Sequence, residues 1–218
     1  ATMVSRYVFG RAPVFHFGML PPFPLRYMWL VVILGIIIGL AGVVFNKGLL
    51  NIHYFYDLPV FRNNYMRIAF ALCMAGILGY VFPEVLGGGN DLVNSLYTLP
   101  LSLKLFAGLL IGKFLFTLVS YGCGVPGGFF LPMLVLGALT GGITGIVFVR
   151  LGLISSYYLS NIVVISMAAF FAASVQSPVT GTILIMEMTS SYEHLLVLCT
   201  ASLVALVVAQ LCQGEPIY

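Results

Sequence analysis

The chain has 218 residues, of which 61% are hydrophobic and only 7% are charged. A soluble globular domain carries about 25% charged residues, so this chain has too few polar side chains to cover a water-soluble particle. Its formal net charge is +3, and its basic residues are too scattered to form a nucleic-acid-binding face. The composition predicts a protein surrounded by lipid, and it excludes most soluble enzyme classes and any open-edged β fold.

Six apolar segments approach the length of about 20 residues that a helix needs to cross a bilayer. In chain order they are Met28–Phe45, Ile68–Phe82, Leu105–Tyr121, Phe129–Val149, Asn161–Met186 and Leu195–Cys212. Pro178 predicts a break within the fifth segment. Arg150 is the only charged residue between Phe114 and Met186, so no soluble domain fits there. We expect residues 1–218 to form one all-helical, multi-pass membrane domain.

Glycine and proline interrupt the apolar segments at several places. The interruptions are Pro83 with Gly87–Gly89, Gly122–Gly128, Gly141–Gly142 and Ser177–Pro178. Irregular backbone at membrane depth is tolerated only where protein or a water-filled cavity covers it, and such interruptions are typical of transport sites built from the ends of half-helices. Loops between ordinary helices are the alternative.

Pairs of glycines spaced four residues apart also recur along the chain. This spacing predicts close approach of helices in lipid. The pairs are Gly35/Gly39, Gly108/Gly112, Gly137/Gly141 and Gly141/Gly145.

The segment Tyr121–Pro132 is a glycine-rich turn that leads directly into an apolar helix. Backbone N–H groups of Phe129 and Phe130 would lie among the unpaired donors at the helix start, where the helix dipole favours an anion. Gly127 and Gly128 would let an ion approach the backbone. The segment contains no Lys or Arg, as suits a site that must also release its ion. A packing turn is the alternative.

Gly128-Phe-Phe-Leu-Pro132 resembles the Gly-x-Phe-x-Pro segment of the CLC chloride channels and proton-coupled chloride transporters. The resemblance covers nearly the whole chain, in family order. It continues through Phe45-Asn46-Lys47, Pro83–Gly89, Ser120–Gly142, Ala172–Gly181, Met186–Thr189 and Gly214–Tyr218.

The resemblance implies a CLC-type bundle of tilted, broken helices that forms the second half of an inverted repeat. It implies that the backbone amides of Phe129 and Phe130 and the hydroxyl of Tyr218 bind chloride, on a backbone shaped by Gly127, Gly128 and Pro132. It also implies a homodimer with one pathway per subunit. We expect no metal and no cofactor besides the bound chloride ion.

Two further anion-binding segments of the family are absent from this sequence, one of the Gly-Ser-Gly-Ile-Pro type and one of the Gly-(Arg/Lys)-Glu-Gly-Pro type. The second carries the external gating glutamate, so none of the six acidic residues here can be named the gate. The chain therefore resembles the C-terminal portion of a CLC membrane domain, and the N-terminal half is an expected partner. Passive conduction and exchange with protons both stay open.

Three other functions compete with chloride transport. A fluoride-exporting CLC is one alternative, although the presence of Tyr218 makes the chain resemble the chloride-transporting branch of the family. A non-conducting structural membrane fragment is another, since half of the ion site is missing. An intramembrane enzyme is not expected: Tyr56-Asp57 resembles half of an aspartyl protease pattern, but no second half, H-E-x-x-H or G-x-S-x-G occurs.

Lys113 lies in the middle of an apolar segment, where a charge is costly and usually functional. It could raise the positive potential along an anion path, reach the membrane interface, or pair with a carboxylate. The basic residues near the segment ends are spread over both sides, so they fix no orientation. We expect an integral membrane protein, located in the cell membrane if it is bacterial.

Overall fold

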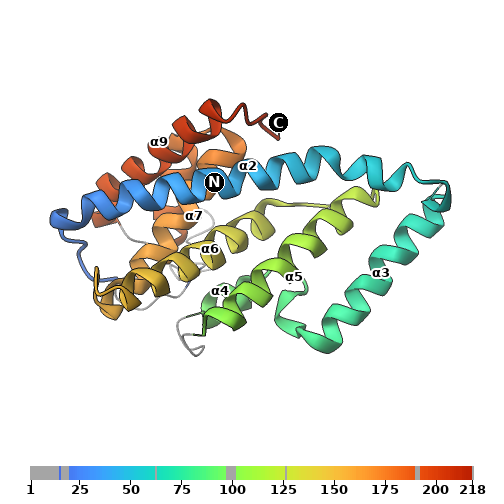
Figure 1. Cartoon of the computed structure of the whole chain (residues 1–218), viewed down its shortest axis with the longest axis horizontal. Coiled ribbons are helices and arrows are strands. Elements are labelled where there is room, and N and C mark those ends of the chain that lie inside the picture. The colour runs from blue at the N-terminus through green and yellow to red at the C-terminus, as the bar shows by residue number, and fades with distance from the viewer. Residues whose placement is uncertain are drawn as a thin grey trace, which may run out of the picture.

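A computed structural model describes residues 15, 20–61, 63–96, 102–125, 127–189 and 192–217 of the chain. Every regular element in these ranges is helical (Figure 1), which confirms the all-α fold class. The α-helices are α2 (Met28–Tyr56), α3 (Asn64–Val81), α4 (Asn90–Ser95), α5 (Leu103–Gly122), α6 (Phe130–Arg150), α7 (Leu159–Val175), α8 (Pro178–Thr189) and α9 (Leu195–Leu211). The 3-10 turns are η1 (Leu25–Tyr27), η2 (Pro59–Phe61), η3 (Pro83–Val85), η4 (Ser156–Tyr158) and η5 (Tyr192–His194).

Six helical stretches are long and apolar enough to cross a membrane, and each overlaps one of the six predicted segments. The break at Pro178 is also confirmed: α7 ends at Val175, Gln176 adopts a left-handed conformation, and α8 begins at Pro178. A proline is well accommodated at the first position of a helix, where its missing N–H costs no hydrogen bond.

Two helical features differ from the sequence prediction. Helix α2 continues to Tyr56 instead of ending at Phe45, because the buried Asn46 side chain has hydrogen-bond partners and Lys47 is exposed. Polar residues at these positions therefore do not end the helix. The short helix α4 was not predicted, since its polar sequence Asn90–Ser95 shows no apolar period.

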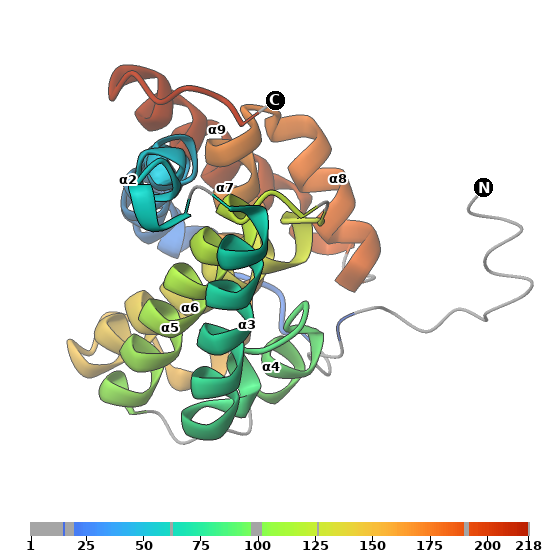
Figure 2. The ribbon, with the colours of Figure 1, turned by 90° about the vertical axis from the view of Figure 1, so that its right-hand side faces the viewer.

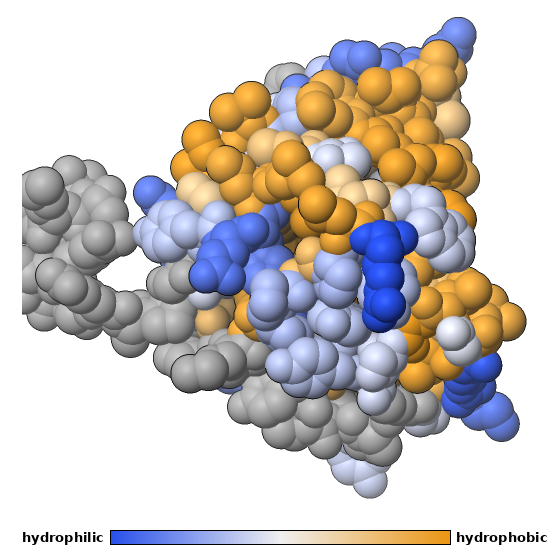
Figure 3. All heavy atoms as spheres, turned by 90° about the vertical axis from the view of Figure 1, so that its left-hand side faces the viewer, coloured by the Kyte–Doolittle hydropathy of each residue, from blue (hydrophilic) through white to orange (hydrophobic). Residues whose placement is uncertain are grey.

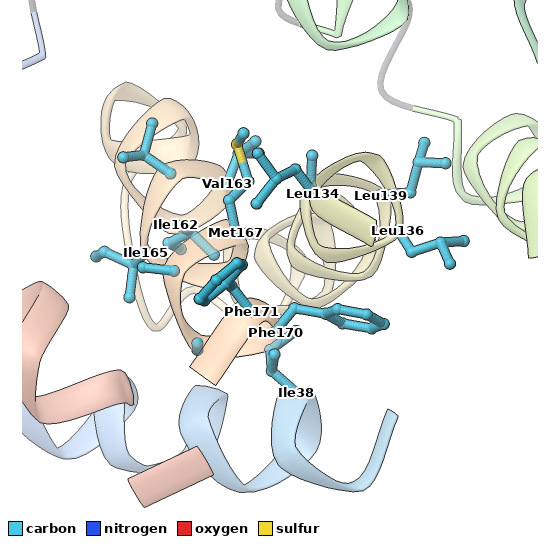
Figure 4. Packing of buried hydrophobic residues seen from close by; sticks show 14 of the residues in the cluster. Ile38, Leu134, Leu136, Leu139, Ile162, Val163, Ile165, Met167, Phe170 and Phe171 are labelled. Carbon is cyan, nitrogen blue, oxygen red and sulfur yellow. The ribbon is translucent and has the colours of Figure 1, made fainter. Parts of the chain in front are cut away.

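Helix α7 forms the centre of the bundle, with 14 of its 17 residues buried. It packs against α6, α9, α2 and α8. Figure 4 shows Met167 of α7 beside Leu134 of α6, and Phe170 of α7 between α6 and Ile38 of α2. A helix covered on all sides must be apolar on all sides, which explains why α7 shows no polar face.

Glycines allow close contact at two helix pairs. A Cβ atom added to Gly35 of α2 would lie 2.9 Å from Cβ of Val204 in α9, and one added to Gly137 of α6 would lie 3.0 Å from the Ser166 carbonyl oxygen in α7. The predicted close approach is confirmed there. Gly108 differs, because its nearest neighbour is the Phe82 ring at an ordinary 3.6 Å.

Helix α3 lies at the outside of the bundle and has one buried residue, Ala71. It contacts α5, η2 and η3 and presents exposed apolar side chains such as Leu72 and Tyr80. In Figure 2 it lies on the side of the molecule that faces the viewer. On the side of the molecule that Figure 3 shows, apolar side chains also cover broad areas of the surface. Such surfaces are suited to lipid or to a further protein layer.

Candidate anion-binding site

A cavity of about 410 Å³ lies where the start of α6 meets the C-terminal half of α5 and the loop after η3. This position joins a helix N-terminus, a transmembrane helix and an irregular loop, which are elements that a transport site requires. The lining residues are Gly87, Gly88, Lys113, Phe116, Thr117, Ser120, Tyr121, Val125, Gly127, Gly128, Phe129, Phe130, Leu131 and Pro132.

The start of α6 presents backbone amides that have no carbonyl partner within the helix. Phe129 is the N-cap, with φ −103° and ψ 2°, and no side chain caps the helix. The first intrahelical bond runs from the Met133 amide to the Phe129 carbonyl oxygen, at 3.0 Å. The amides of Phe130 and Leu131, in the first turn of α6, have no carbonyl partner within the helix, and Pro132 has no N–H to contribute. The helix dipole adds partial positive charge at this end.

The two glycines before α6 are not required by packing within the chain. Among the described residues, a Cβ atom added to Gly128 would meet no atom within 4 Å, and one added to Gly127 would meet only the Val125 carbonyl oxygen, at 3.9 Å. Both residues line the cavity. Their lack of side chains therefore leaves backbone open toward the cavity, where an anion can approach it closely.

Aromatic contacts hold the two phenylalanine side chains in place. The Phe129 ring, which is buried, meets Tyr121 edge-to-face with centroids 5.4 Å apart. The Phe130 ring meets Phe171 of α7 at 5.9 Å. These two contacts restrain the Phe129 and Phe130 side chains on either side of the helix start.

Lys113 of α5 is fully buried beside the cavity, and its ammonium group is occupied by backbone carbonyls. Nζ donates hydrogen bonds to the carbonyl oxygens of Val85, at 2.8 Å, and Gly87, at 2.7 Å. The sequence left three roles open for Lys113. Because the ammonium group binds two backbone carbonyl oxygens, it neither reaches the membrane interface nor pairs with a carboxylate. These bonds hold the glycine loop against α5, while the charge stays close to the start of α6.

The predicted site residues Gly127, Gly128, Phe129, Phe130 and Pro132 all line this one cavity. Tyr218 lies outside the described residues. Sequence reasoning assigned no site role to the loop residues Gly87 and Gly88 or to Tyr121. For the loop, the sequence offered one indication, namely three consecutive glycines (Gly87–Gly89) and a lysine, Lys113, within an apolar segment. No group of His, Cys, Asp and Glu in the described ranges could hold a metal.

Residues 1–210 match the family described as "Voltage gated chloride channel". The chain belongs to this family. An H(+)/Cl(-) exchange transporter ClcA from Vibrio vulnificus (strain YJ016) is 35% identical over 229 residues, which cover all of this chain and 47% of that protein. A protein of the same name from Salmonella agona (strain SL483) is 35% identical over 225 residues, with the same coverage.

The fold also matches a CLC-type structure. The crystal structure of a slow cyanobacterial Cl-/H+ antiporter aligns with a TM-score of 0.89 at 30% identity, covering all of this chain and 51% of that one. The chain thus spans about half the length of the relatives that it matches. Membership of this family, together with six apolar helices, makes the chain a multi-pass membrane protein.

Proposed function

We propose that this chain forms part of a chloride pathway in which the anion rests against the start of α6. The observation that carries the proposal is the start of α6, where no side chain caps the helix and the bare backbone of Gly127 and Gly128 lines a cavity. We further propose chloride–proton exchange rather than passive conduction, because the relatives found in sequence and in structure are named as exchangers.

The proposed site stabilises an anion through neutral groups. The amides of Phe129 and Phe130 donate to the ion, and the Tyr218 hydroxyl completes the contact from the end of the chain. Neutral donors replace part of the hydration shell without the strong binding of a full opposite charge, so the ion can also leave. The nearby Lys113 charge is already offset by two carbonyl oxygens, so it favours the anion without forming an ion pair with it.

The proposal extends to the rest of the molecule. Residues 1–218 would form the C-terminal portion of a CLC membrane domain, and an N-terminal half would supply the other anion-binding segments and the gating glutamate. Two such subunits would form a homodimer in the cell membrane. No cofactor besides chloride would be needed.

Anomalous diffraction tests the anion position directly. Crystals of the intact protein soaked in bromide should show an anomalous peak within hydrogen-bond distance of the Phe129 and Phe130 amides. A bromide peak elsewhere in the pathway and none at this position would contradict the proposed site.

Flux measurements test the transported ion. Liposomes containing the intact protein should release chloride and take up protons in a fixed ratio. Chloride flux without proton movement would indicate a channel, and fluoride flux without chloride flux would indicate a fluoride exporter. Absence of any anion flux would favour a structural role.

A further inference from the structure

The segment after α9 turns back across the bundle instead of leaving it. Gln213 has a φ of 50°, and the Gly214 amide donates to the Ala209 carbonyl oxygen at 2.8 Å. A Cβ atom on Gly214 would lie 3.0 Å from that oxygen and 3.2 Å from Cγ2 of Val43 in α2. Both distances are shorter than ordinary van der Waals contact, so the chain lies closely against α9 and α2 here.

Asn46 of α2 binds this returning segment to the end of α7. Its side chain is 1% exposed. Nδ2 donates to the Ser174 carbonyl oxygen at 2.9 Å and to the Glu215 carbonyl oxygen at 2.8 Å. A primary amide carries two N–H donors, so one side chain satisfies a carbonyl at a helix end and one in the extended segment.

Two more hydrogen bonds fix the same segment. The Gln176 side-chain amide donates to the Gly214 carbonyl oxygen at 2.6 Å, and the Ile217 amide donates to the Ser174 carbonyl oxygen at 3.4 Å. Gln176 and Gln213 are the two non-glycine residues with positive φ in the described ranges. A non-glycine residue keeps this unfavourable conformation only where the surrounding structure holds it. Here the hydrogen bonds from Asn46 and Gln176 hold the backbone around both residues.

We propose that Asn46 is a positioning residue for the Tyr218 hydroxyl. Ile217, the last residue whose position is described, is followed directly by Tyr218, and the path of residues 214–217 is fixed by Asn46, Gln176 and Ser174. Asn46 touches the proposed ligand only through this segment. The inference rests on the proposed function, because it assigns Asn46 a role through the tyrosine that is proposed to bind the anion.

A double-mutant cycle tests this coupling in the intact protein, with chloride affinity measured by calorimetry. Tyr218→Phe should raise the dissociation constant about three- to tenfold, as loss of one neutral hydrogen bond does. Asn46→Leu, which keeps a similar volume but has no donor, should raise it by a similar factor. The double variant should be no weaker than Tyr218→Phe alone. Fully additive losses would overturn the proposal.

Asn161→Leu is the matched control for the loss of a buried amide. Asn161 is also 1% exposed and donates to a backbone carbonyl oxygen, that of Pro21, at 2.7 Å. This variant should leave chloride affinity unchanged within about twofold. An equal loss in Asn161→Leu would show that any buried amide has this effect, and it would overturn a specific role for Asn46.

A fluorine label separates the positioning role from anion binding. With 3-fluorotyrosine at position 218, the intact protein should give one narrow ¹⁹F resonance, which broadens or splits in Asn46→Leu whether or not chloride is present. An unchanged resonance would overturn the positioning role. If Tyr218→Phe leaves chloride affinity unchanged, the proposed chloride contact is wrong, and the fluorine spectrum still decides whether Asn46 fixes Tyr218.

Gln176→Leu keeps the proposal testable if Asn46→Leu does not fold. It removes one bond to the same segment, at Gly214. We expect the same change in the fluorine resonance and a smaller loss of chloride affinity, about two- to fivefold. An unchanged resonance and affinity in this variant would also count against the proposal.

Discussion

Gly128 shows how a single residue can serve the proposed site without serving the fold. A methyl group at this position would contact none of the described residues, and the position itself lines the cavity at the start of α6. Gly124, in the same turn, differs because its φ is +83°. The two glycines therefore have separable roles, one in access to the backbone and one in the turn itself.

Gly128→Ala should reduce anion transport with little change in stability. The added methyl group keeps the ion away from the backbone, and weakening one or two contacts of about 1 kcal/mol each corresponds to roughly a five- to thirtyfold loss of affinity. The unfolding free energy should change by less than about 0.5 kcal/mol. Flux and thermal unfolding of the intact protein check both expectations.

Gly124→Ala provides the contrast. Its left-handed backbone should cost the variant about 1–2 kcal/mol of stability, although space is open around it. If Gly124→Ala were as stable as the parent protein, or if Gly128→Ala transported anions at the normal rate, the two glycines would not have these separate roles.

Lys113 is buried and donates to two backbone carbonyl oxygens, so its ammonium group contributes to the stability of the fold. Lys113→Met should lower the unfolding free energy by about 1–3 kcal/mol, because the Val85 and Gly87 carbonyl oxygens lose a shared donor. Lys113→Arg keeps the charge and donors and should retain more stability. Thermal unfolding of both variants measures this, and equal stability of Lys113→Met and the parent protein would show that the two bonds contribute nothing.

At the scale of elements, some helix glycines allow close contact with a second helix, and others face open space. Helices α2 and α9 meet at Gly35 and Gly39, where side chains and backbone of α9 leave no room for a methyl group. On α3, a Cβ atom added to Gly76 would have no neighbour within 4 Å among the residues that the structure describes. The same substitution should therefore have opposite consequences in the two helices.

Gly35→Ala should destabilise the protein by about 1–3 kcal/mol, since α2 and α9 must move apart to admit the methyl group. Gly76→Ala should be neutral or stabilising by up to about 1 kcal/mol, because alanine loses less backbone entropy in a helix. Unfolding experiments on the two variants make the comparison, and destabilisation by Gly76→Ala would indicate an additional close neighbour of α3.

At the scale of the whole molecule, burial falls from the centre to one edge. Helix α7 is covered by α6, α9, α2 and α8, whereas α3 has one buried residue and rests on α5 and the turns η2 and η3. Local stability follows the amount of tertiary packing. The α3 edge should therefore open more readily than the centre.

Hydrogen exchange should show this gradient. For the 218-residue chain in detergent micelles, amides of α3 should exchange at least about tenfold faster than those of α7, which corresponds to about 1.4 kcal/mol in opening free energy. Mass spectrometry of the exchanged protein resolves the two helices. Equal protection of α3 and α7 would show that the described packing does not set the order of opening.

The sequence by itself determined the membrane environment, the six apolar helices, the break at Pro178 and the family. These depend on composition, local periodicity and the geometry of proline, all of which act along the chain. It also indicated Gly127, Gly128, Phe129 and Phe130 as candidates, because a glycine-rich turn before a helix is a local pattern.

Only the tertiary structure decided what surrounds that turn. The carbonyl partners of Lys113 lie 26 and 28 residues away, and the bonds of Asn46 to Ser174 and Glu215 span 128 and 169 residues. The predicted apolar segment stopped at Phe45, whereas the folded chain buries the Asn46 amide within α2 and provides both carbonyls. Hydrogen bonds between distant segments form only once packing brings those segments together, so no local pattern in the sequence encodes them.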